Sequence, residues 1–283
     1  MRKLKNPKMK RASLIAVGCA VLAGAVTVGS FLIYDRIQAD KYGFTNLDNI
    51  SVPAPITDEA IELDVKLDEI TMHYAVYGET GRQPIILIHG NSSSHLGLDS
   101  AARYLANDFT VYSIDSRCHG QSSDPGVITY DLMAEDTAQF IKKLNLEKPY
   151  ILGHSDGAIV ALTLAYTYPD LPGAVVACGA NSRPDMMKPY FTLGVLLSNL
   201  RRHDKLNDLM LTLPDMTAGK LGKITCPTDI VIAENDIMYL SDAVFMRDNI
   251  KLSSLDILKG ENHSSYVSLN GKKAYRVAMN FLK

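Results

Sequence analysis

Residues 150–165 read Tyr-Ile-Leu-Gly-His-Ser-Asp-Gly-Ala-Ile-Val-Ala-Leu-Thr-Leu-Ala, and this stretch decides the fold. A short apolar run precedes the Gly-x-Ser-x-Gly pattern at residues 153–157, and a helix-like apolar run follows it. Between a buried strand and a helix this pattern is a nucleophile elbow, where the turn strains the serine backbone and the flanking glycines avoid a clash. The helix that follows points its free N–H groups at the serine. The pattern predicts that Ser155 is a nucleophile, and its context argues against chance occurrence.

A nucleophilic serine needs a general base, and the base needs a carboxylate that orients it. Two later strand-like runs each end in a candidate, the first in Asp236 and the second in His263. Because the C-terminal ends of parallel strands meet at one edge of a sheet, we expect both near Ser155. Asp236 is the predicted acid and His263 the predicted base. Glu234 remains an alternative acid, and an exposed loop histidine remains an alternative interpretation of His263.

Acyl-transfer chemistry also needs two backbone N–H groups that stabilise the developing oxyanion. Asp156, the residue after the nucleophile, supplies one of them. An apolar run at residues 84–88 ends in His89-Gly90-Asn91, and the Asn91 N–H is the natural second donor. Gly90 permits a close backbone approach, and His89 is expected to make structural hydrogen bonds rather than to act in catalysis.

Five sequence blocks, in this order, resemble the α/β-hydrolase superfamily of serine hydrolases over nearly all of residues 55–283. They are His89-Gly90-Asn91, residues 115–122, residues 153–157, Glu234-Asn235-Asp236 and Gly260-Glu261-Asn262-His263. The second block resembles the family's Asp-x-Arg-Gly-x-Gly-x-Ser turn, but Cys118 stands where glycine is usual, which puts the shape of that turn in doubt. A serine at the elbow argues against the dehalogenase and epoxide-hydrolase branches, which resemble this fold but use aspartate.

The resemblance implies an α/β-hydrolase fold, with a mostly parallel eight-stranded sheet, helices on both faces and a short cap. The alternation of β-branched runs with longer helical patterns agrees with it. The chain has 283 residues with 47% hydrophobic content, enough for one substantial core. The expected strands lie at residues 61–67, 70–77, 85–88, 110–114, 150–152, 173–178, 229–233 and 255–258, the first two antiparallel. The expected helices lie at residues 99–106, 130–144, 156–168, 239–249 and 272–282.

The resemblance places residues 181–223 as a cap over the site, and substrate specificity is expected to come from it. Its apolar side chains, Met187 and Phe191 among them, either form a pocket wall for an acyl or aromatic group or are buried against the body. Asp156 is a third candidate for substrate binding. Its carboxylate either stabilises the helix N-terminus or binds a substrate ammonium group, because Ser-Asp-Gly resembles the arrangement in hydrolases of amino-acid esters. The short cap predicts a shallow or open site.

The N-terminal part of the chain predicts a membrane signal-anchor. Residues 1–11 carry six positive charges and no acidic residue, and residues 12–34 contain no charged side chain. A helix over those 23 residues reaches about 34 Å, enough for one transmembrane crossing. The positive-inside rule then keeps residues 1–11 in the cytoplasm. A linker at residues 35–54 would connect the anchor to an extracytoplasmic catalytic domain at residues 55–283.

Two alternatives to an uncleaved anchor remain. Ala23-Gly24-Ala25 has the form of a signal-peptidase site, and cleavage there would give a secreted protein. A lipid on Cys19 would give a lipoprotein, although the apolar stretch continues long after this residue. Ala16, Ala20 and Gly24 recur every four residues, a small-residue stripe that would allow two anchors to form a weak homodimer.

Composition limits the remaining partners. Without the six N-terminal cations, 23 basic residues face 31 acidic ones, a net charge of −8, which offers no footprint for nucleic acid. No disulfide is expected, because Cys178 and Cys226 fall at opposite ends of the expected sheet. The sequence contains no zinc-finger spacing and no glycine-rich phosphate loop, so it predicts neither a metal nor a cofactor.

These residues together predict a serine hydrolase that acts on small-molecule carboxylic esters through an acyl-enzyme intermediate. The alternatives on the same catalytic triad are amide, carbon–carbon bond or amino-acid-ester hydrolysis and acyl transfer. A non-catalytic binding protein that kept the fold is an alternative of a different class. The preference for esters rests on the resemblance, because one fold supports many chemistries.

Overall fold

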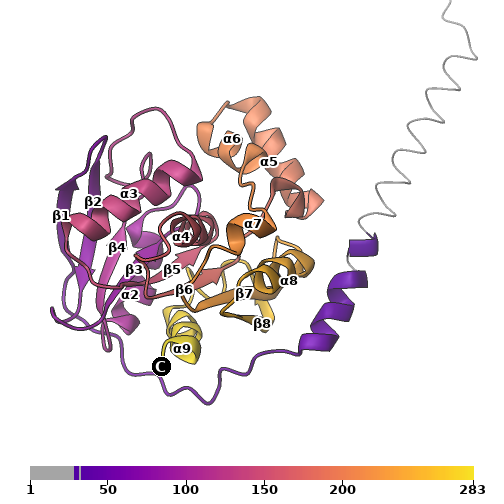
Figure 1. The fold of residues 1–283 in the computed structure, drawn as a ribbon, viewed down its shortest axis with the longest axis horizontal. Coiled ribbons are helices and arrows are strands. Elements are labelled where there is room, and N and C mark those ends of the chain that lie inside the picture. The colour runs from indigo at the N-terminus through magenta and orange to yellow at the C-terminus, as the bar shows by residue number, and fades with distance from the viewer. Residues whose placement is uncertain (1–28, 32) are drawn as a thin grey trace, which may run out of the picture.

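The computed structural model describes residues 29–31 and 33–283. The predicted cytoplasmic segment and most of the predicted transmembrane segment lie outside these described residues. Within the described ranges, no helix combines the length and apolar character that a membrane crossing requires. Figure 1 shows a central twisted sheet with helices on both of its faces and a small helical cap at one end.

An eight-stranded sheet forms the centre of the described chain. Its strands are β1 (Ile61–Lys66), β2 (Thr71–Tyr77), β3 (Pro84–Ile88), β4 (Thr110–Ile114), β5 (Tyr150–His154), β6 (Ala174–Cys178), β7 (Thr228–Asn235) and β8 (Ser253–Asn262). Their spatial order is β1-β2-β4-β3-β5-β6-β7-β8, and only the pairings that involve β2 are antiparallel. The prediction of a mostly parallel sheet with an antiparallel start is confirmed.

Helices cover both faces of the sheet. They are α2 (Asp99–Leu105), α3 (Tyr130–Lys143), α4 (Asp156–Thr167), α8 (Leu240–Asn249) and α9 (Gly271–Leu282), each predicted to within one residue at either end. Helices α3, α4 and α8 bury their apolar residues against one face, and α2 and α9 bury theirs against the other. This layering places the C-terminal ends of the parallel strands, where the site forms, between two packed cores.

The last two strands are longer than the sequence predicted. Strand β7 continues to Asn235 and β8 to Asn262, and these two residues still pair after a bulge. Residues 259–262, Lys-Gly-Glu-Asn, lack the apolar pattern of a buried strand, because this end of the parallel pair is largely exposed to solvent. The extension matters for function, because Asp236 follows β7 directly and His263 follows β8 directly.

Residues 181–223 form a small helical cap, whose helices the sequence did not predict. They are the 3₁₀ turn η2 (Pro184–Met186) and helices α5 (Pro189–Arg201), α6 (Lys205–Thr212) and α7 (Ala218–Leu221). Met187 and Val195 are buried and Phe191 is half-buried, but the other large apolar side chains of α5 are exposed. Those exposed residues are Tyr190, Leu193, Leu196, Leu197 and Leu200. Neither expected role, a pocket wall or a buried face, therefore applies to most of α5.

The described end of the predicted anchor and the residues that follow it pack against the body. Residues 33–42 are helical, and the Asp35 carboxylate accepts hydrogen bonds from the backbone N–H groups of Leu240 and Ser241 at the start of α8. Further along, the Thr45 N–H donates to the Ile257 carbonyl oxygen. The predicted linker is thus held along the body by specific contacts.

Candidate active site

Ser155 lies at the turn between β5 and α4, in the elbow that the sequence predicts. Its backbone has φ 56° and ψ −120°, a left-handed conformation that a residue with a side chain rarely adopts. The turn is tight: a Cβ on Gly157 would lie 2.0 Å from the Ile88 carbonyl oxygen. Glycine is therefore required at that position, and the strain at Ser155 is borne by the surrounding sheet.

The structure brings Ser155, His263 and Asp236 into one chain of hydrogen bonds. The Ser155 Oγ lies 2.9 Å from His263 Nε2, and His263 Nδ1 lies 2.7 Å from Asp236 Oδ1. When His263 donates its Nδ1–H to Asp236, its Nε2 lone pair faces the serine hydroxyl. A serine in this arrangement can transfer its proton to the imidazole and attack an electrophile.

The environment of Asp236 favours its ionised carboxylate although the residue is buried. Desolvation alone raises the pKa of its carboxyl. The charge and hydrogen bond of His263 and the backbone amides of Ala233 and Met238 outweigh that effect and lower the pKa below its usual range. The carboxylate therefore stays ionised at neutral pH and stabilises a protonated His263.

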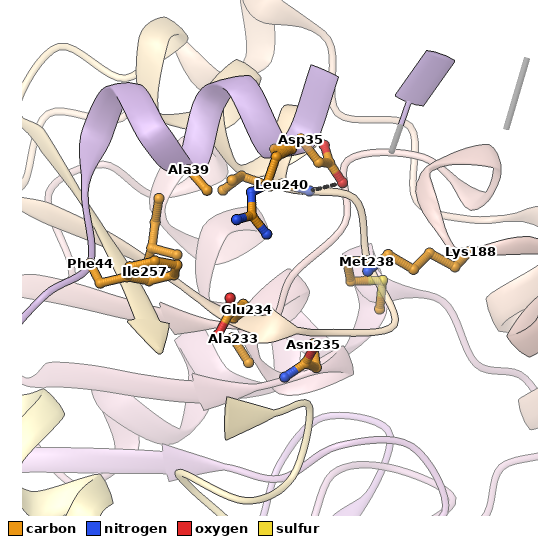
Figure 2. Close-up of a pocket in the computed structure, with 11 residues that line it drawn as sticks. Asp35, Ala39, Phe44, Lys188, Ala233, Glu234, Asn235, Met238, Leu240 and Ile257 are labelled. Carbon is orange, nitrogen blue, oxygen red and sulfur yellow. Dashed lines mark hydrogen bonds between the residues drawn. The ribbon is translucent and has the colours of Figure 1, made fainter. Parts of the chain in front are cut away.

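The alternative acid, Glu234, lies elsewhere. Its carboxylate accepts a hydrogen bond of 2.8 Å from the Gly260 N–H. Figure 2 shows Glu234 among the residues that line a separate pocket, beside the helix that carries Asp35 and Ala39. The hydrogen-bond pattern thus favours Asp236 over Glu234 as the partner of His263.

The sequence analysis did not predict the roles of two residues beside His263. His154 binds its backbone, and Gly179 leaves room for its ring. The His154 Nε2 lies 2.7 Å from the His263 carbonyl oxygen, and the two rings lie 5.0 Å apart. Burial, reinforced by the charge of His263, lowers the pKa of His154 to about 4, so His154 is neutral and donates its Nε2–H. Gly179 has φ +68°, and a Cβ there would lie 2.9 Å from His263 Cε1. The sequence offered no signal for either role.

His89 makes the structural hydrogen bonds that the sequence predicts. Its Nδ1 lies 2.7 Å from the Gly90 carbonyl oxygen, and its Nε2 accepts from the Ser116 N–H at 3.1 Å. Burial, with a smaller effect of the neighbouring His119, lowers the pKa of His89 to about 4. A neutral ring with both nitrogens engaged fixes the loop that carries Asn91.

The predicted oxyanion donors come from two segments next to Ser155: Asn91 lines the same cavity as Ser155, and Asp156 follows it directly. The Asn91 N–H has no acceptor in the described part of the chain. Asp156 opens α4, where first-turn N–H groups have no intrahelical acceptor. The two side chains are joined, because Asn91 Nδ2 donates to Asp156 Oδ2 at 2.9 Å and to the Leu206 carbonyl oxygen at 3.1 Å. The same contact ties the loop after β3 to the cap.

The Asp156 carboxylate is buried and has partners within the protein. Burial raises the pKa of its carboxyl, while hydrogen bonds from Asn91 and Tyr130 act in the opposite direction. The carboxylate borders a cavity of about 10 Å³, the room of a single water. This environment favours a structural role over the binding of a substrate ammonium group.

A larger cavity of about 360 Å³ opens over Ser155 and His263. The loop after β3 forms one wall, and Phe191, Met210 and Ile237 contribute an apolar wall. Phe191 also lines the small cavity beside Asp156, whereas Met187 lines only that small cavity. Ser155 borders both cavities, so Met187 and Phe191 both lie near the nucleophile, and Phe191 is the predicted cap contact that reaches the larger cavity. Among the described residues, no group of three metal-ligating side chains lies at this site.

A family model described as the alpha/beta hydrolase fold matches residues 83–209. The matched segment includes the loop that carries Asn91 and the elbow that carries Ser155. With the sheet order given above, the match supports the α/β-hydrolase superfamily, and the chain has the α/β-hydrolase fold.

Curated relatives are similar to parts of the chain. An abhydrolase domain-containing protein of Schizosaccharomyces pombe is 38% identical over 89 residues, 31% of this chain and 33% of that protein. An sn-1-specific diacylglycerol lipase of Danio rerio is 33% identical over 105 residues, 36% of this chain and 33% of that protein. Ethanol acetyltransferase 2 of Hanseniaspora uvarum is 28% identical over 153 residues, which are 50% of this chain and 44% of that protein. The chain spans less than half the length of these relatives.

Solved structures share the fold over more of the chain. A membrane phospholipase A has a TM-score of 0.65 and 18% identity, and covers 97% of this chain and 96% of its own. The enol-lactonase from Burkholderia xenovorans also has a TM-score of 0.65, with 16% identity, and covers 78% of this chain and 99% of its own. At these identities the likeness establishes the fold alone.

Proposed function

We propose that this chain is a serine hydrolase that acts on carboxylic esters. The observation that carries the proposal is the hydrogen-bonded chain from Ser155 through His263 to Asp236, open to a cavity of about 360 Å³. The names of similar proteins, which include lipases, an esterase and acetyltransferases, support ester chemistry.

In the proposed mechanism, His263 Nε2 accepts the Ser155 proton as Oγ attacks the ester carbonyl carbon. The backbone N–H groups of Asn91 and Asp156 donate to the oxyanion, and Asp236 stabilises the imidazolium. His263 then gives the proton to the departing alcohol. Water attacks the acyl-enzyme with His263 as base again, which releases the acid and restores Ser155.

Labelling of the full-length protein in detergent with a fluorophosphonate probe tests the nucleophile. We expect Ser155→Ala to abolish labelling and to lower ester turnover on the order of 10⁴-fold or more. Ser268→Ala is the matched control, because Ser268 lines the same cavity and is expected to leave labelling intact. Labelling that survives in Ser155→Ala would contradict the assignment of the nucleophile. A series of short-chain and long-chain p-nitrophenyl esters would measure how long an acyl chain the cavity takes.

Acyl transfer is the second candidate, because one similar protein is an ethanol acetyltransferase. An acyl-enzyme that meets an alcohol instead of water gives a new ester, so both outcomes share the first half-reaction. Turnover of an acetyl ester with and without added ethanol separates them. Accumulation of ethyl acetate at the expense of acetate would favour the transferase. Acetate alone at every ethanol concentration would favour hydrolysis.

For the location of the protein, we propose a single membrane-spanning helix and an extracytoplasmic catalytic domain. Its support is the uncharged stretch at residues 12–34, which follows six positive charges. A secreted form after cleavage near Ala23-Gly24-Ala25 is the competing outcome. The weak homodimer through the anchor stays a prediction from the small-residue stripe.

A further inference from the structure

A second cluster of functional side chains lies on the antiparallel side of the sheet, apart from Ser155. Glu62 comes from β1, His73 from β2, and His95 opens the 3₁₀ turn η1 (His95–Leu98) that follows β3. One ligand atom from each lies within 4.8 Å of those of the other two. The proposed mechanism uses none of these three residues.

The ligand atoms have separations suited to a metal ion. His73 Nε2 lies 3.6 Å from Glu62 Oε2, and His95 Nε2 lies 3.8 Å from Glu62 Oε1. Tetrahedral Zn²⁺ with bonds of about 2.0–2.2 Å holds neighbouring ligand atoms about 3.3–3.6 Å apart. The two histidine–glutamate separations lie within a few tenths of an ångström of that range, and the ligand atoms of all three groups lie within 4.8 Å of one another.

Carboxylates orient both imidazole rings. His73 Nδ1 lies 2.9 Å from Asp64 Oδ1, and His95 Nδ1 lies 2.9 Å from Asp115 Oδ1. A hydrogen bond from Nδ1–H to a carboxylate fixes the tautomer that leaves the Nε2 lone pair free for a cation. Metal-bound histidines nearly always have such a partner on the other ring nitrogen.

His95 supplies independent evidence for an absent ligand. Its side chain is only 2% exposed, and its Nε2 has no hydrogen-bond partner among the described residues. Leaving a buried polar atom unsatisfied costs about 1–3 kcal/mol. A cation between this nitrogen and Glu62 would satisfy it.

Gln121 occupies the remaining side of the cluster. Its Nε2 lies 3.0 Å from His73 Nε2, and its side chain is exposed. The amide can rotate by half a turn and present Oε1 to the cation, or it can swing aside and leave the position to water. Either movement would give the cation a fourth ligand.

We propose that Glu62, His73 and His95 bind one Zn²⁺ ion. Two imidazoles and one carboxylate form a ligand set that suits zinc and other first-row divalent metals more than Ca²⁺ or Mg²⁺. The ion would join β1, β2 and the start of η1. Because His95 follows Asn91 by four residues, it would also brace the loop that carries the predicted oxyanion donor.

Zinc binding is measured directly on the full-length protein in detergent, after treatment with a chelator, by competition with a chromophoric zinc indicator. We expect one Zn²⁺ per chain that excess Mg²⁺ or Ca²⁺ does not displace. Glu62→Gln should weaken binding at least tenfold, and His73→Ala at least a hundredfold. Glu62 is half-exposed, so Glu62→Gln keeps the fold even where His73→Ala does not.

His203→Ala is the matched control, because His203 is exposed and also has a carboxylate neighbour, Asp208, at 3.2 Å. This variant should bind zinc as the unmodified chain does. Substitution with Co²⁺ gives a second readout, a visible d–d spectrum of nitrogen and oxygen ligation that Glu62→Gln changes. The proposal is overturned if no stoichiometric zinc binds, or if binding is unaltered in both Glu62→Gln and His73→Ala.

Discussion

His154 occupies the first x position of Gly-x-Ser-x-Gly, and its imidazole forms a hydrogen bond with the backbone of His263. Loss of its hydrogen bond to the His263 carbonyl oxygen, about 1–1.5 kcal/mol, corresponds to roughly tenfold in rate if the base shifts away from Ser155. We expect His154→Phe to lower kcat about tenfold with little change in KM. His154→Gln keeps an N–H donor and should recover part of the loss. An unchanged kcat in His154→Phe would remove His154 from the site.

Cys118 is strained at the position where glycine is usual in the resembling family. Its φ is 64°, and this conformation costs a residue with a Cβ about 1–2 kcal/mol. Glycine removes that strain but loses more entropy on folding, so Cys118→Gly should raise the free energy of unfolding by about 0.5–1 kcal/mol. Urea denaturation measures the change.

Asn145 provides the comparison for Cys118, because its φ is 52°. Asparagine tolerates this conformation better than cysteine, so Asn145→Gly should gain less stability than Cys118→Gly. A destabilised Cys118→Gly would mean that the cysteine side chain contributes more than its conformation costs.

At the scale of elements, β7 and β8 carry a buried acidic pair. Asp229 on β7 is 1% exposed, and burial, with a smaller effect of Asp256 on β8, raises the pKa of Asp229 to about 8. A carboxyl whose folded pKa lies above its unfolded value stabilises the fold fully below the unfolded pKa, near 3.9. That contribution is lost as the pH rises through about 8.

Asp229→Asn should therefore become progressively more stable than the unmodified chain as the pH rises. We expect the difference in free energy of unfolding to grow by on the order of 4 kcal/mol between pH 5 and pH 8. Denaturation at several pH values measures it, with Asp170→Asn on an exposed loop as the control. A difference that does not vary with pH would contradict the raised pKa of Asp229.

Most of the elements that the sequence predicted well carry apolar residues that are buried in one of the two cores. Helix α5 could not be interpreted in this way, because its apolar side chains point both inward, as Val195 does, and into solvent, as Leu200 does. The pairing of Ser155, Asp236 and His263 was predictable because parallel strands deliver their last residues to one edge. The role of Gly179 was not, because it depends on a contact between β6 and a loop more than eighty residues later. Glu62, His73 and His95 likewise have no motif spacing, since the fold alone brings them together.

At the scale of the whole molecule, the helix at residues 33–42 joins the body through Asp35. This carboxylate accepts hydrogen bonds from two first-turn N–H groups of α8, as a capping side chain does. The Phe31 ring also stacks on the Tyr239 ring, with their centroids 4.8 Å apart. Asp35→Ala should lower the free energy of unfolding by about 1 kcal/mol. Asp40→Ala, at an exposed position of the same helix, should have little effect. Equal effects of the two variants would show that the capping contact contributes nothing specific.

Docking of that helix determines how the predicted anchor would hold the catalytic domain. The last described residues of the predicted anchor, 29–31, 33 and 34, are helical like residues 35–42, and Phe31 stacks on Tyr239, so the domain would sit beside the bilayer without a free tether. We expect the full chain to remain in the membrane fraction after a high-salt wash, because burial of about 20 apolar residues does not depend on ionic strength. A chain that lacks residues 1–28 should be released with its fluorophosphonate labelling intact, because Asp35 is retained. Protease added to intact cells should digest the domain. A mature chain that begins after Ala25, identified by mass spectrometry in the soluble fraction, would replace the anchor with a cleaved signal peptide.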